Sequence, residues 1–144
     1  MLTVKYKQLF FDRAKVVKAL DRVNRRYLAR GGRYVQKVAR SSMKRRKGPS
    51  DPGEPPNVHE GSLRKLLYFV YDPPGSMLIG PVGRRGSNVP AALEFGGKST
   101  SRVRVRRGQY AKKVVQIDKR PYMRPALDKS KGKLSEIYAQ SIRG

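Results

Sequence analysis

The sequence predicts an α+β domain, and three observations support this class. Apolar side chains recur at helical spacing in the first third of the chain and again in its last part. Between them, short apolar or alternating runs separated by Gly and Pro turn signals are typical of β-hairpins. We therefore expect a single domain, 1–144. It comprises a basic helical region (1–47), a proline-rich extended arm (48–61), and a small antiparallel sheet of hairpins with a short helix and a C-terminal helix (62–144).

The first predicted element is a long basic helix from Asp12 to about Lys47. Its apolar stripe consists of Val16, Leu20, Val23, Tyr27, Tyr34 and Val38, at spacings of three, four or seven. Asp12 is a suitable N-cap, and the basic run KRRK lies near the negative end of the helix dipole. Gly31 and Gly32 interrupt the pattern at about 1 kcal/mol each relative to Ala. The sequence allows a bend or a break into two helices there.

The next segment, GPSDPGEPPNVHEG at 48–61, is predicted to be an extended connector. Its prolines, Pro49, Pro52, Pro55 and Pro56, lack a backbone N–H and push the residues before them towards extended geometry. The segment also carries three of the ten acids and the only histidine, His59. A lone loop histidine is more often a surface side chain than a ligand. We interpret the segment as an arm whose acids face the basic surface of its own or a neighbouring subunit.

Two hairpins are predicted after the arm. A short helical turn leads into LYFVY at 67–71, DPPG at 72–75 signals a turn, and the following SMLIGPVG is the second strand. In the second hairpin, SRVRVRRG alternates Arg with Val at period two, and it pairs with KKVVQID across a loop containing Gly108.

Two more helices complete the predicted domain. VPAALEFGG is a short helix closed by Gly96 and Gly97, with Leu93 and Phe95 buried. The C-terminal helix has Pro125 in its first turn. Its buried side is predicted to carry Leu127, Leu134, Ile137 and Tyr138.

Charge narrows the choice of partner. The formal net charge is +24, and residues 1–47 hold 16 Lys/Arg against two acids. This excess indicates an acidic partner: nucleic acid, an acidic protein surface or an anionic membrane. A membrane is the poorest candidate, because the basic helix lacks a broad apolar face with Trp or Phe.

Composition also bears on location. There is no cysteine and no run of roughly 18 apolar residues that would span a bilayer. The start also lacks the residue order of a signal peptide. We expect a soluble protein made in cytoplasm.

The sequence offers no catalytic set. One histidine cannot build a histidine-based triad or metal cluster, and the carboxylates are scattered. The glycines of IGPVGRRG match neither of the phosphate-binding glycine patterns. We therefore expect no enzymatic activity, no cofactor and no metal.

Nucleic-acid binding is the alternative function. Residues 98–113 carry seven Lys/Arg, no acid and Tyr110, so a hairpin there could lie along phosphates. The candidate contacts to phosphate or to an acidic partner are Arg102, Arg104, Arg106, Arg107, Lys112 and Lys113. The same arginines could instead form a solvated strand face or meet a neighbouring subunit.

Four motifs occur along the chain in this order: PSDPGEPPNVHEGSLRKLL, IGPVG, VPAALEFGG and RPYMRPALDKSKGKL. In this order the chain resembles the small neck and tail-completion proteins of long-tailed bacteriophages, which join the DNA-filled head to the tail. The motif positions taken as interface or structural residues are Pro52, Gly53, Pro55, Pro56, Glu94, Phe95, Gly96, Arg120, Pro121, Tyr122, Arg124 and Pro125. Further matching positions are Gly61, Leu63, Gly80, Pro81, Leu93, Met123, Ala126 and Leu127.

The resemblance implies an α+β subunit without catalytic residues that works in a ring. The expected partners are the chain itself, in six-fold or twelve-fold rings, adjacent head-completion, portal-adaptor or tail-terminator rings, and packaged DNA. Such a protein is assembled in the host cytoplasm and resides at the head–tail junction of the virion. Glu94 is expected to pair with Arg120 or Arg124, inside a subunit or across a ring interface.

Overall fold

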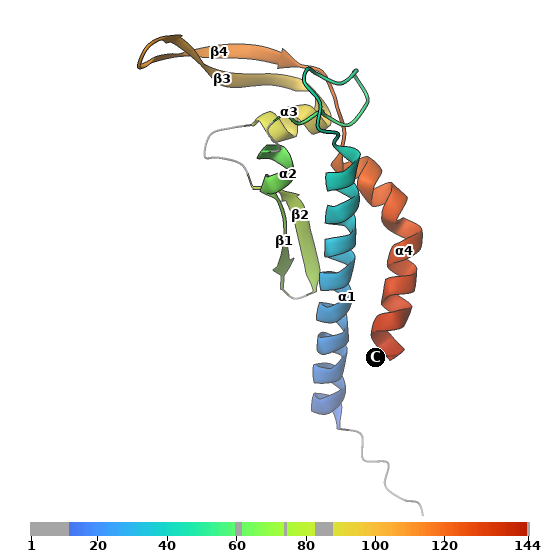
Figure 1. Cartoon of the computed structure of the whole chain (residues 1–144). Coiled ribbons are helices and arrows are strands. Elements are labelled where there is room, and N and C mark those ends of the chain that lie inside the picture. The colour runs from blue at the N-terminus through green and yellow to red at the C-terminus, as the bar shows by residue number, and fades with distance from the viewer. Residues whose placement is uncertain (1–11, 60–61, 74, 83–87, 144) are drawn as a thin grey trace, which may run out of the picture.

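The structure, a computed structural model, describes residues 12–59, 62–73, 75–82 and 88–143, with the side chains of residues 62 and 101–104 left out (Figure 1). It confirms the α+β class. The elements are α1 (Arg13–Ser42), α2 (Ser62–Leu66), β1 (Leu67–Asp72), β2 (Ser76–Pro81), α3 (Val89–Phe95), β3 (Gly97–Arg106), β4 (Gln109–Ile117) and α4 (Met123–Arg143).

The long helix α1 begins and ends for identifiable reasons. The side chain of Asp12 accepts a hydrogen bond from the N–H of Lys15 at 3.0 Å, so the predicted N-cap is confirmed. The helix ends at Ser42, earlier than the predicted Lys47. Met43 adopts extended backbone angles and its side chain is buried in the core.

Gly31 and Gly32 neither bend nor break α1, which is one continuous helix through both residues. They are contact points for other elements. A Cβ on Gly31 would lie 3.0 Å from a methyl group of Leu134, and one on Gly32 would lie 3.3 Å from the ring of Phe69 and run into the sulfur of Met77. The pair lets α4 and the first hairpin pack directly on the backbone of α1.

The elements are arranged around α1 (Figure 1). Helix α4 runs antiparallel beside it, and the β1–β2 hairpin packs along another side. The β3–β4 hairpin projects from the end of the molecule where α3 lies. Within the described residues the predicted antiparallel hairpins are both present, as two separate two-stranded sheets and not as one continuous sheet. Each ladder is made only by its own adjacent strands.

The core sits at the C-terminal end of α1 and draws on four parts of the chain. Its buried cluster is Ala39, Met43, Val58, Leu67, Tyr122 and Ala126. The arm therefore contributes to the core through Val58, whose N–H also donates to the carbonyl of Lys44 at 3.0 Å. The arm turns at Asp51–Glu54 and folds back, so it is less extended than predicted.

The predicted apolar stripe of α1 is only partly used. Val23, Tyr27, Tyr34 and Val38 are half-buried, whereas Val16 and Leu20 are exposed. The fully buried side chains of α1, Val35 and Ala39, lie outside the predicted stripe. The prediction is wrong for the first turns of α1, because no other described element covers them.

The buried side of α4 also differs from the prediction. Ile137 is buried as expected, but Leu127 and Tyr138 are exposed. The other buried positions are Ala126, Ser130 and Ser141. Small residues there permit a close approach to α1, and the two hydroxyls donate to carbonyls of their own helix at 2.7 Å.

Candidate functional site

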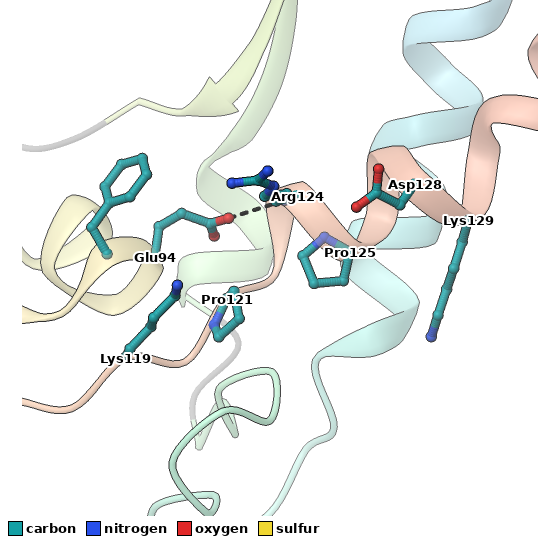
Figure 2. A pocket seen from close by; sticks show the side chains of 8 residues that line it. Glu94, Lys119, Pro121, Arg124, Pro125, Asp128 and Lys129 are labelled. Atoms are coloured by element: carbon teal, nitrogen blue, oxygen red, sulfur yellow. Dashed lines mark hydrogen bonds between the residues drawn. The ribbon is translucent and has the colours of Figure 1, made fainter.

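Three of the four motif segments, which lie far apart in the sequence, meet at one junction; the fourth, IGPVG, contributes Gly80 and Pro81 to β2, where they pair with β1. The junction brings together the arm, the C-terminal end of α3, residues 118–122 and the first turn of α4 (Figure 2). Pro52 is exposed, Pro55 is half-buried and Pro56 is buried. The N–H of Gly53 donates to the carbonyl of Lys119 at 2.8 Å. The arm thus binds the irregular segment 118–122 that leads into α4.

Glu94 is the centre of this junction. Its side chain is 8% exposed, and its carboxylate accepts three backbone hydrogen bonds, from Tyr122 at 2.9 Å, Met123 at 3.0 Å and Arg124 at 2.9 Å. These N–H groups belong to the start of α4, where the helix has no carbonyl partners for them. Glu94 therefore caps α4 from another helix, and its negative charge lies at the positive end of the helix dipole.

Within one subunit, the expected ion pair of Glu94 with Arg120 or Arg124 is wrong. Within the described residues no salt bridge joins Glu94 to an arginine; it binds the backbone of Arg124, not its guanidinium (Figure 2). The physical reason lies in the start of α4. Residues 120–122 include no Ser, Thr, Asp or Asn that could cap the helix locally, so the buried carboxylate satisfies the N–H groups instead.

Tyr122 fills the core beside this cap. Its side chain is fully buried, and among the described residues its hydroxyl has no hydrogen-bond partner. Burial, followed by the negative charge of Glu94, raises the pKa of the Tyr122 phenol to about 12. The phenol is therefore neutral at ordinary pH and acts as a packing group.

Arg120 ties the arm to the junction. Its Nε donates to the carbonyl of Ser50 at 2.9 Å, and its guanidinium lies 3.7 Å from the carboxylate of Asp118. Its own N–H donates to the carbonyl of Leu93 at 2.6 Å. Arg120 thereby links α3, the arm and the segment that precedes α4.

Gly96 ends α3 as predicted. It has φ 80°, a left-handed conformation that favours glycine, and its N–H donates to the carbonyl of Ala92 at 2.8 Å. Leu93 is partly buried against the core.

Phe95, predicted to be buried, is 77% exposed. Neighbouring residues on a helix point in different directions. Because Glu94 turns inwards to cap α4, Phe95 is directed to the surface. It lines a groove of about 470 Å³ together with Lys119, Pro121, Arg124 and Pro125 (Figure 2). The motif residues thus form a junction that is buried at Glu94 and Tyr122 and bordered by an exposed apolar surface at Phe95.

The predicted phosphate-contacting residues lie apart from the junction, on the β3–β4 hairpin. Arg106, Arg107, Lys112 and Lys113 are all exposed. The backbone register pairs residue 102 with Lys112 and residue 104 with Tyr110. The side chains of Arg102 and Arg104 lie outside the described part of the structure, as does Gly61.

The described residues contain no group of three or more His, Cys, Asp or Glu side chains that could hold a metal ion. His59 is exposed and belongs to no such group. No helix in the described ranges is long and apolar enough to cross a membrane.

Sequence reasoning selected Glu94 but assigned it the wrong partner. The signal that could have identified its role is the missing local cap before α4, combined with Pro125, which removes one N–H from the first turn. It also missed the link between Asn88 and Ser99 at the base of the second hairpin, a 2.7 Å side-chain hydrogen bond. Comparisons of the chain with protein-family models, with curated protein sequences and with solved structures give no match.

Proposed function

We propose that the chain is a structural subunit of the neck of a long-tailed bacteriophage. It forms a homo-oligomeric ring, six-fold or twelve-fold, at the head–tail junction of the virion. Its neighbours are adjacent head-completion, portal-adaptor or tail-terminator rings. It works by complementary surfaces without catalysing a reaction.

The observation that carries this proposal is the convergence of three of the four motif segments. Positions spread from Gly53 to Arg124 meet through Glu94 and Arg120 at a single buried joint. The motif residues of a family commonly hold its fold together, and here they form this joint. This supports the resemblance as a property of the fold.

The apolar outer face of β1–β2 supports assembly. Val70 and Leu78 are paired across the strands and are 60% and 64% exposed, and Tyr68 lies two residues along on the same face. Within the described chain no element covers this face. A two-stranded sheet gains stability when its apolar face is covered, and a second subunit of a ring would provide that cover.

The first turns of α1 present a second uncovered apolar surface. Val16, Val17 and Leu20 are exposed among basic side chains. A subunit with two apolar surfaces on different elements suits a heterologous, ring-closing interface.

The first test asks where the protein resides. Mass spectrometry of purified virions and labelling electron microscopy are expected to find it at the head–tail junction. Its absence from mature particles would overturn the proposal.

The second test asks whether the chain assembles. Native mass spectrometry of the full chain is expected to show a closed ring, which Val70→Asp should disrupt. Ser135→Asp adds the same charge at an exposed position of α4 and should leave the ring intact. A protein that remains monomeric at every concentration, in virion extracts as well as in pure form, would contradict ring formation.

A further inference from the structure

The β3–β4 hairpin has an unusual charge for its length. Residues 97–117 include seven Lys/Arg and no acid. Every side chain from Val105 to Gln116 is exposed, and the hairpin projects away from the two long helices (Figure 1). Among described elements outside the hairpin, its main neighbour is α3. Among the described side chains, Arg106, Arg107, Lys112 and Lys113 form no ion pair with an acid of the chain.

The base of the hairpin is fixed to the body. The side chain of Asn88 donates to the carbonyl of Lys98 at 3.0 Å and accepts a hydrogen bond from the hydroxyl of Ser99. Ser99 is buried. These hydrogen bonds fix the orientation of the hairpin at its base, and its outer part remains exposed to a partner.

The strand register places most basic positions on one face of the ribbon. Adjacent strand residues point to opposite faces and directly paired residues share a face, so residues 98, 102 and 104 and Lys112 belong to one face and Lys113 to the other. Arg106 and Arg107 lie at the turn, next to an irregularity in the ladder. A groove of duplex DNA has a phosphate backbone on each side, so the strongly basic face can lie along one backbone while Lys113 and the turn reach the other.

We propose that the β3–β4 hairpin binds duplex DNA, lying in a groove with its basic side chains on the phosphates of both strands. The major groove of B-DNA admits a two-stranded β-ribbon. At about 3.3 Å per residue, the ten residues of β3 span roughly one turn of the duplex. The contacts are to the backbone and are independent of base sequence. This binding is a property of the single chain, so it does not rest on ring formation.

The hairpin is better suited to this role than α1, which is also basic. Asp12 and Asp21 lie on the first turns of α1, and its C-terminal half is covered by α4 and the first hairpin. The hairpin combines an unbroken positive charge with two open faces.

The experiment measures the affinity of the full chain for a fluorescent duplex of about 20 base pairs, roughly two helical turns, across a series of NaCl concentrations. The wild-type chain is expected to give a steep negative slope of log K against log [NaCl]. Lys112→Gln/Lys113→Gln should reduce the magnitude of this slope by about 1.8, because each lost phosphate contact removes about 0.9. Arg106→Gln/Arg107→Gln provides a second variant at the turn, with the same expectation.

The control is Lys18→Gln/Lys37→Gln, which removes the same charge from exposed positions of α1 and should leave the slope near the wild-type value. Two results would overturn the proposal. In the first, control and hairpin variants lose the same slope, which would make the binding a general effect of net charge. In the second, the hairpin variants keep the wild-type slope but lose self-assembly in native mass spectrometry, which would assign the hairpin to a protein contact.

Discussion

The carboxylate of Glu94 accepts the backbone N–H of Arg124 at 2.9 Å, across thirty residues of sequence. The last turn of α3 thereby caps the first turn of α4. This contact couples the short helix, which roots the basic hairpin, to the long antiparallel pair of helices. The position of the β3–β4 hairpin relative to α1 and α4 depends on this contact.

Removing the Glu94 cap should destabilise the protein. Glu94→Ala leaves three N–H groups, one buried and two partly buried, without this acceptor, and we expect the free energy of unfolding to fall by about 2 to 4 kcal/mol in urea denaturation. Glu94→Gln keeps one acceptor oxygen and should cost less. Glu136→Ala removes an exposed carboxylate of α4 and should change the free energy by no more than about 0.5 kcal/mol. Equal losses for the two alanine variants would refute the capping role.

Tyr122 should make stability depend on alkaline pH. Its pKa is about 12 in the folded chain against 10.0 for the ordinary phenol. The folded state therefore retains a proton that the unfolded state releases, and stability falls as pH rises from about 10 to 12. Across these two pH units the free energy of unfolding should fall by about 2 to 3 kcal/mol.

Tyr122→Phe should flatten this part of the pH profile in thermal unfolding. It should cost little at neutral pH, because the buried hydroxyl has no hydrogen-bond partner among the described residues. Tyr110→Phe, on the exposed hairpin, is the control and should keep the wild-type profile. An unchanged profile in Tyr122→Phe would show that this phenol does not cause the alkaline loss.

Arg120→Ala should loosen the arm. The substitution removes the hydrogen bond to the Ser50 carbonyl and disturbs the neighbouring bond from Gly53 to Lys119. A hydrogen bond from a charged group contributes about 1.5 to 3 kcal/mol, so amides of the arm should exchange with D₂O about tenfold faster or more. Hydrogen-exchange mass spectrometry measures this. Arg45→Ala, at an exposed site, should leave the exchange unchanged. Equal protection in both variants would mean that Arg120 does not hold the arm.

Two Gly→Ala substitutions should change the free energy of unfolding in opposite directions. Gly32→Ala places a methyl group against Phe69 and Met77, and we expect it to destabilise by about 1 kcal/mol, because overpacking outweighs the gain in helix propensity. At Gly132, an exposed position of α4, an added methyl group would have no atom within 4 Å. Gly132→Ala should therefore raise the free energy of unfolding by about 0.5 to 1 kcal/mol. Thermal unfolding of both variants decides this. Stabilisation by both would show that the hairpin does not pack closely on α1.

The sequence by itself determined the local elements. Asp12 indicated the start of α1, and Gly96 indicated the end of α3. Gly108, which has φ 84°, indicated the turn of the second hairpin. These signals are local, since capping, turn geometry and left-handed backbone angles depend on a residue and its near neighbours. The order of the elements and the α+β class followed from them.

Only the tertiary structure decided which surfaces are buried and which groups are partners. Periodicity marks an apolar face but does not say how far a second element extends along it, so Leu20 is exposed where the pattern predicted burial. Glu94 looked like the partner of an arginine and instead caps a helix. Gly32 looked like a helix interruption and instead allows a hairpin to pack. Each outcome depends on contacts between distant segments, which a local pattern does not contain.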